Sequence, residues 1–129
     1  MGCFNYTMEL AKSREGPFIK IEAAFDTGAY YSYLPKSIVD SLGIEASGRR
    51  RLGLADGTLI ERNIGDAWVR INDEVHATVC VLGDEDADAL LGAVTLEEFS
   101  LSADPVNERL VPMEKLPMLW LSGSKGVGI

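Results

Sequence analysis

The chain has 129 residues, of which 47% are hydrophobic and 25% are charged, and its formal net charge is −8. This length suits one domain with its own core, and the acidic excess argues against nucleic acid and anionic membranes as main partners. Two cysteines and a single histidine provide neither a disulfide framework nor the ligands of a zinc site.

The first third of the chain predicts two strands, a loop and a short helix. Strands are expected at residues 3–10 and 18–25, because apolar and polar residues partly alternate there and a Gly-Pro pair breaks the chain between them. After a loop, Pro35 starts a helix that Gly43 ends, since proline is favoured in a first helical turn and glycine just past the last one.

The middle of the chain is typical of strands joined by tight turns. Residues 49–71 predict a strand, a turn, a second strand and, after Gly65, a third. The first turn is Ala-Asp-Gly-Thr at 55–58, because Asp-Gly is a strong hairpin signal. A second turn is expected at residues 72–73, followed by a buried strand that extends to Leu82.

The last third begins with an acidic loop, Asp-Glu-Asp-Ala-Asp at 84–88. A short apolar strand at 89–92 ends in glycine, and one or two helical turns follow at 93–100. A further strand is predicted at 101–104 and is halted by Pro105, which cannot donate a ladder hydrogen bond. The chain then reaches a final apolar run.

Together these elements predict one all-β domain, mainly β with one or two short helices. We assign residues 1–122 to this domain and 123–129, a segment rich in small residues, to a flexible tail. No apolar segment approaches the roughly 20 residues that span a bilayer, and no signal peptide is visible. We therefore expect a cytoplasmic protein with no membrane span.

Three features have plain structural interpretations. Cys80 lies in an apolar strand and is expected to be a small core residue. His76 is expected to be a strand residue with a local partner. The short basic cluster at 49–51 is expected to be a solvated strand face or loop.

One carboxylate stands out, Asp26, which ends an apolar strand and is followed by Thr27 and Gly28. Partial burial at such a position disfavours the charged form of a carboxyl group. Glycine two residues on allows a sharp turn and the close approach of another chain, and the threonine hydroxyl can hold the loop. A polar turn after a strand is the simpler alternative, because Asp and Gly are both common in turns.

The surroundings of this triplet extend the pattern. The segments "AFDTGAYYSYLP", "LADGT", "ALLGAVTLEEFSLSAD" and "LVP" follow one another over residues 18–112. In order and spacing they resemble the retropepsin-like aspartic proteases, the single-domain relatives of retroviral proteases. The resemblance implies a closed β-barrel of the acid-protease fold, with half of an active site in each chain.

The resemblance also implies roles for individual residues. Asp26 matches the catalytic aspartate, and Thr27 matches the residue whose hydroxyl reaches across a subunit interface to lock two active-site loops. Gly28 and Ala29 match loop positions that hydrogen-bond to the substrate backbone.

Two further segments take roles from the same resemblance. The turn formed by Ala55, Asp56 and Gly57 matches the flap that closes over a bound peptide. Leu91 and Gly92 match the strand that braces the catalytic loop from below.

The resemblance implies an aspartic endopeptidase with no metal and no other cofactor, acting on peptides or proteins. Such chemistry needs one ionised and one protonated carboxyl group, and the chain has one Asp-Thr-Gly. The second aspartate should therefore come from a second copy in a two-fold homodimer. Apolar groove walls are expected near Tyr30, Tyr31, Leu54 and Leu90, which favours extended peptides with apolar side chains.

Some residues depart from the family pattern. The turn at 55–57 is shorter than a glycine-rich viral flap tip, Ala93 follows the brace glycine in place of Arg or Asn, and Tyr30 and Tyr31 are bulky beside the catalytic loop. An alternative is therefore a catalytically weak or inactive peptide-binding or dimerisation module of the same fold. A third interpretation is a structural domain in which Asp-Thr-Gly is only a turn.

Two segments of the sequence are candidates for the dimer interface. Candidate interface strands are residues 2–10 and the apolar run at 116–122, because an unpaired apolar strand would be an aggregation hazard in a monomer. The run at 116–122 could equally pack onto its own domain.

Overall fold

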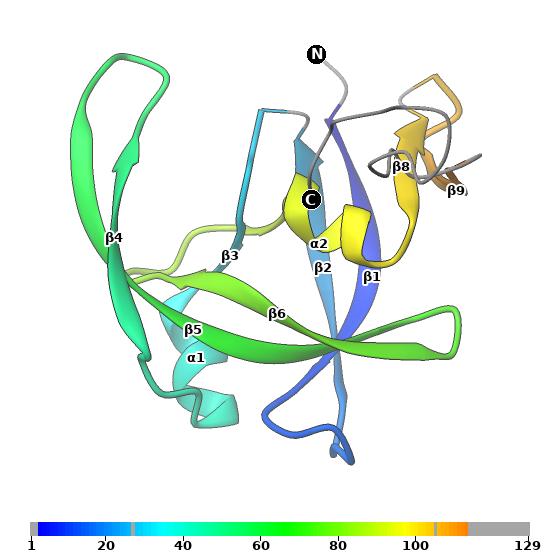
Figure 1. The fold of residues 1–129 in the computed structure, drawn as a ribbon, viewed down its shortest axis with the longest axis horizontal. Helices are drawn as coiled ribbons and strands as arrows, with labels where there is room; N and C mark the ends of the chain where they lie inside the picture. Colours follow the sequence, from blue (N-terminus) through cyan, green and yellow to red (C-terminus); the bar gives the residue numbers. More distant parts are fainter. Residues whose placement is uncertain (1–2, 27, 105, 114–129) are drawn as a thin grey trace, which may run out of the picture.

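A computed structural model of the chain describes residues 3–26, 28–104 and 106–113. The strands and helices in chain order are β1 (Cys3–Ala11), β2 (Ile19–Asp26), β3 (Ser32–Leu34), α1 (Lys36–Leu42), β4 (Gly48–Gly53), β5 (Leu59–Ile71), β6 (Glu74–Leu82), β7 (Ala89–Leu91), α2 (Ala93–Glu98), β8 (Leu101–Asp104) and β9 (Arg109–Pro112). The described part of the chain is mainly β with two short helices, as predicted (Figure 1).

Six strands close into a barrel in the order β1-β2-β7-β3-β6-β5, and pairing of β1 with β5 completes the ring. The antiparallel pairs are mostly neighbours in the chain, whereas β2–β7 and β3–β6 are parallel. Closure leaves few open strand edges in the barrel itself. β4 lies outside the ring, paired with the start of β5, and this hairpin reaches away from the barrel (Figure 1).

β5 is one strand of 13 residues, so the predicted break after Gly65 is wrong. Gly65 stays in the ladder opposite Cys80, and a glycine is needed there because the site has no room for a side chain. A methyl group at Gly65 would lie 2.6 Å from the Glu45 carbonyl oxygen. The glycine therefore marks a close approach of backbone to the strand, which is the other common reason for glycine in a strand.

The turn predicted at residues 72–73 joins β5 to β6. Asn72 and Asp73 have φ angles of 52° and 69°, the left-handed pair that a two-residue hairpin turn requires. α1 also begins and ends where expected, with Pro35 at its N-cap and Gly43 at its C-cap with a φ of 70°. These local signals were sufficient because each depends on one or two residues.

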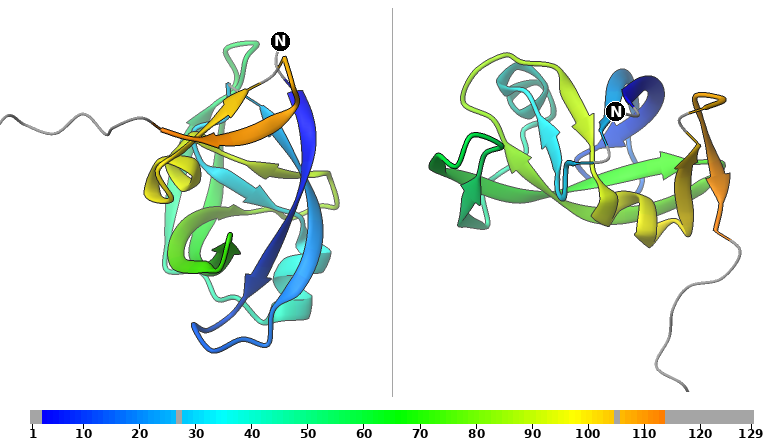
Figure 2. Two further views of the ribbon diagram at one scale, coloured as in Figure 1. Left: turned by 90° about the vertical axis from the view of Figure 1, so that its right-hand side faces the viewer. Right: turned by 90° about the horizontal axis from the view of Figure 1, so that it is seen from above.

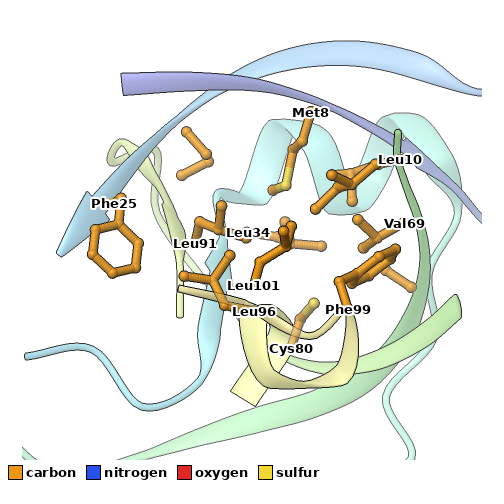
Figure 3. Close-up of a cluster of buried hydrophobic side chains, with 14 of the residues drawn as sticks. Met8, Leu10, Phe25, Leu34, Val69, Cys80, Leu91, Leu96, Phe99 and Leu101 are labelled. Carbon is orange, nitrogen blue, oxygen red and sulfur yellow. The ribbon is translucent and has the colours of Figure 1, made fainter. Parts of the chain in front are cut away.

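Apolar side chains from the strands and from α2 fill the interior of the barrel. The largest fully buried side chains include Met8, Leu10, Leu34, Leu91 and Val69. Leu96 on α2 and Phe99, the residue that caps this helix, add to the core (Figure 3). Cys80 is buried in this core as predicted, and burial raises the pKa of its thiol to about 12. His76 lies on β6 with Glu74 as its partner at 2.6 Å, also as predicted.

The strand predicted at 101–104 is present as β8 and pairs with β9 in a separate two-stranded sheet next to the barrel (Figure 2). Of the candidate interface strands, residues 3–11 form β1, a strand of the barrel wall, and β2 pairs with it along most of its length. The run at 116–122 and the tail at 123–129 lie outside the described residues, as does Pro105. No helix among the described residues is long and apolar enough to cross a membrane.

Candidate active site

Asp26 is the last residue of β2, so the strand delivers the Asp-Thr-Gly loop (residues 26–31) to one end of the barrel. β1 pairs with β2 up to that point, with Cys3 opposite Asp26. On the other side, Phe25 pairs with Leu91 in the parallel β2–β7 ladder. Thr27 and the side chain of Asp26 lie outside the described part of the chain.

Leu91 and Gly92, the predicted brace, lie directly beside this loop. Leu91 is fully buried in the core. Gly92 meets the backbone of the loop so closely that a methyl group there would lie 2.6 Å from the Tyr31 carbonyl oxygen and 2.7 Å from the Ser32 nitrogen. Only glycine fits this contact without moving backbone, because real Cβ atoms do not approach that closely.

The N-terminus of α2 holds the same loop by hydrogen bonds. The first amides of a helix have no partner within it, and here two of them donate to loop carbonyls. Ala93 N donates to the Ala29 carbonyl and Val94 N to the Tyr30 carbonyl, each at 3.0 Å. Ala93, which departs from the family pattern, therefore contributes through its backbone.

A buried cluster of hydroxyl groups completes this support, and sequence analysis missed it. Thr95 Oγ1 on α2 lies 2.6 Å from Ser32 Oγ and 2.9 Å from Thr78 Oγ1. Gly92 N donates to Ser32 Oγ at 3.0 Å. The three side chains are almost completely buried, so each depends on the others for its hydrogen bonds.

A groove of about 820 Å³ runs beside the Asp-Thr-Gly loop. Its lining residues are Gly28, Ala29, Tyr30, Tyr31, Tyr33, Arg51, Leu52, Gly53, Leu54, Ile60, Arg62, Val81, Glu85, Ala87, Asp88 and Leu90. All four residues expected in apolar groove walls are among them. The loop, the β4–β5 hairpin, the acidic loop at 84–88 and β7 thus meet around one concave surface, which is the common form of a ligand site.

The predicted flap turn lies at the tip of the β4–β5 hairpin, and its three residues do not line the groove. The strands behind the tip do so instead, through Leu52, Gly53, Leu54 and Ile60. The tip is a tight turn, with Gly57 at φ 88° and its amide donating to the Leu54 carbonyl at 2.9 Å. Hydrogen bonds from Thr58 lower the pKa of the Asp56 carboxyl group.

Charged groups border the groove on two sides. Arg62 on β5 forms an ion pair with Asp84, with Nε and Oδ1 3.5 Å apart. The Tyr33 hydroxyl donates to the Glu85 carbonyl at 3.3 Å, and its pKa is raised by burial and then by the nearby Glu85 and Asp84 carboxylates. The described residues contain no cluster of His, Cys, Asp and Glu that could hold a metal ion.

The basic cluster at 49–51 lies on β4 with exposed side chains, as predicted. Arg49 donates to Asn63 at 2.8 Å and forms an ion pair with Glu61 at 3.4 Å. Exposed pairs of this kind contribute little to stability. Arg51 also reaches the rim of the groove.

No protein-family model matches the sequence, and a search among curated proteins found no match. Solved structures do match. EIAV protease complexed with the inhibitor HBY-793 is similar with a TM-score of 0.56 and 15% identity, over 74% of this chain and 86% of that chain.

A retropepsin-like aspartic protease from Rickettsia conorii is also similar, with a TM-score of 0.50 and 23% identity over 81% of this chain and 89% of that chain. Identities this low carry information about the fold and not about the reaction. The two structural matches agree with the closed barrel described above. The chain therefore has the fold of the retropepsin-like aspartic proteases.

Proposed function

We propose that the chain is an aspartic endopeptidase whose active site is formed by Asp26 from each subunit of a homodimer. The observation that carries the proposal is the position of the Asp-Thr-Gly loop. It leaves the end of β2, is braced by β7 and α2, and borders a groove of about 820 Å³.

The proposed chemistry needs two carboxyl groups that share one proton. Two such groups about 3 Å apart cannot both ionise, so one acts as a general base toward water while the other is an acid toward the scissile carbonyl. Water attacks the carbonyl carbon directly, and no covalent intermediate forms with the protein. The two apparent pKa values belong to the pair and not to either residue.

The homodimer follows from the single Asp-Thr-Gly of the chain. In a two-fold dimer the same surface of each copy meets its own mate, so one motif in the sequence supplies two carboxyl groups. The fold supports a homodimer, because it is shared with proteases of similar chain length. This chain covers 86% of the EIAV protease chain and 89% of the Rickettsia conorii protease chain.

Roles for the neighbouring residues are part of the proposal. Thr27 would lock the two loops across the interface, while Gly28 and Ala29 would bind the substrate backbone from the groove wall. Leu91 and Gly92 support the loop from the core. The hairpin tip at Ala55, Asp56 and Gly57 would reach the substrate only after the hairpin moves toward the groove.

The test is cleavage of a diverse peptide mixture from pH 4 to pH 7, read by mass spectrometry, for wild type and Asp26→Asn. We expect cuts by the wild type that the variant does not make, because the amide cannot act as base or acid. Sedimentation of both proteins measures the dimer separately. A well-folded dimer that makes no cut, or equal cuts by the two proteins, would contradict the proposal.

The second candidate is a peptide-binding module of the same fold without useful catalysis. The short hairpin tip favours it, because the tip residues do not line the groove. Binding of labelled peptides by both wild type and Asp26→Asn, with no cleavage by either, would identify this function.

A further inference from the structure

The acidic loop at 84–88 forms one border of the groove, and its four carboxylates divide into two pairs. Asp84 is engaged with Arg62, 3.5 Å from its Nε. Asp86 accepts a hydrogen bond from the Ser37 amide at 2.9 Å, at the start of α1. These two acids therefore tie the loop to β5 and α1.

Glu85 and Asp88 form the other pair. Both line the groove and are exposed, and neither carboxylate has a hydrogen-bond or ion-pair partner within residues 3–26, 28–104 and 106–113. Their backbone is nevertheless well held. The Glu85 carbonyl accepts from Lys36 N at 3.2 Å and Tyr33 Oη at 3.3 Å, and Asp88 directly precedes β7. The two carboxylates are thus presented from supported positions and not from a loose tip.

The cations at the groove do not neutralise them. Arg62 is already paired with Asp84. Arg51 also lines the groove, and its guanidinium has no ion pair among the described residues, since Glu61 opposite it on β5 pairs with Arg49. A single free cation can offset one of the two carboxylates but not both. The charge left uncompensated along the groove is therefore negative, and the net charge of −8 has the same sign.

We propose, on the basis of the function proposed above, that the groove selects extended peptides with a lysine or arginine side chain at the position that passes Glu85 and Asp88. Apolar side chains on either side would contact Tyr30, Leu54 and Leu90. Successive side chains of an extended peptide point to opposite sides, so one strand can place a basic group on the acidic border and apolar groups in the groove. The field of an acidic protein also speeds the approach of basic segments.

The test uses fluorescein-labelled decapeptides that differ only in a Lys, Gln or Glu moved stepwise along an apolar sequence. Their dissociation constants are measured on the Asp26→Asn protein, so that binding is scored without cleavage. At one position we expect Lys to bind more tightly than Gln, by about two- to five-fold for each carboxylate, the range of an exposed ion pair. Glu should bind most weakly there, and added salt should reduce the difference.

Four variants on this background separate the groove carboxylates from charge in general. Glu85→Gln and Asp88→Asn should each reduce the preference for Lys, and Asp88→Lys should turn it toward Glu. Glu15→Gln, at an exposed residue in the β1–β2 turn, changes the net charge by the same amount as Glu85→Gln or Asp88→Asn and should leave the preference intact. Circular dichroism of each variant checks that it is folded.

The outcomes distinguish this inference from the proposed function. Preferential binding of Lys peptides without cleavage by the wild type leaves the inference standing and overturns the protease. Cleavage with no preference at any position, or with a preference for Glu, overturns the inference and leaves the protease. If Glu15→Gln weakens the preference as much as Asp88→Asn, the net charge is responsible and the assignment to the groove is wrong. No binding and no cleavage overturns both.

Discussion

The two walls of the groove are built in different ways. On one side, β7, α2 and Ser32 hold the Asp-Thr-Gly loop with buried hydroxyl groups, helix amides and a glycine that touches backbone. On the other, the β4–β5 hairpin has exposed apolar residues, with Leu54 at 45% and Leu59 at 62% exposure. Figure 1 shows that hairpin extending away from the barrel.

This difference suits the two walls to different tasks in the proposed function. A catalytic loop must keep its groups in place, and supporting contacts from the core achieve that. A wall that admits a substrate must open, and segments with few buried contacts are the ones that open at low cost in free energy. We therefore expect substitutions in the loop-supporting wall to be costly and matched substitutions in the hairpin to be mild.

The largest effect is expected for Gly92→Ala. The added methyl group would meet the backbone at Tyr31 and Ser32, which cannot give way without moving the loop. We expect a loss of about 3 kcal/mol or more in the free energy of unfolding, at the upper end for overpacking in a core, together with loss of activity. Urea unfolding followed by circular dichroism measures it.

Gly53→Ala in the hairpin is the matched control. A methyl group at Gly53 would meet only the Leu59 side chain at 3.8 Å, an ordinary contact. Its unfolding free energy should stay within about 0.5 kcal/mol of the wild type. Equal losses in the two variants would show that the walls do not differ in rigidity.

Thr95→Val should have the next largest effect. Valine keeps the shape of threonine but removes the hydroxyl group that joins Ser32 to Thr78, leaving both without that partner in the core. A buried polar group without a partner costs about 1–3 kcal/mol. Thr7→Val removes an exposed hydrogen bond to Glu22 and serves as the control, for which a change within about 0.5 kcal/mol is expected in the same urea experiment.

The features that sequence analysis predicted are mostly local. The turns and the helix between Pro35 and Gly43 follow from short patterns whose meaning depends on near neighbours, whereas the apolar groove residues were expected from the family resemblance. The hydroxyl cluster follows from neither, because Ser32 and Thr95 are 63 residues apart and hydroxyl residues in apolar segments occur for many reasons. The strand break predicted after Gly65 is wrong for a related reason. A glycine that breaks a strand and a glycine that admits a neighbouring backbone are identical in the sequence.

Gly57→Ala tests the hairpin tip by a different mechanism. Nothing lies within 4 Å of the position that a methyl group would take, so no contact is strained. The φ of 88° is, however, unfavourable for any residue with a Cβ atom, which costs about 1 kcal/mol. We expect that modest loss in urea unfolding, well below the loss for Gly92→Ala. A loss as large as for Gly92→Ala would mean that the tip is packed against something in solution.

The smallest effect concerns the charge at the tip. Hydrogen bonds from Thr58 lower the pKa of Asp56 below its ordinary value of 3.8. A carboxyl group with a lowered pKa stabilises the folded state above its unfolded pKa, and this contribution is lost only as the pH falls through the folded value. From about pH 5 to pH 7 Asp56 therefore stays ionised, and a change in peptide binding or cleavage over that range must come from other groups.

An NMR titration of the Asp56 carboxyl carbon measures this directly, with Asp73 in the β5–β6 turn for comparison. We expect the midpoint for Asp56 below 3.8, and Asp56→Asn should keep the pH profile of the wild type from about pH 5 to pH 7. If Asp56 titrates within that range, the turn is not held by Thr58 in solution. The tip would then be free to rearrange over the groove as the pH changes, and the pH profile would report on the hairpin as well as on the Asp26 pair.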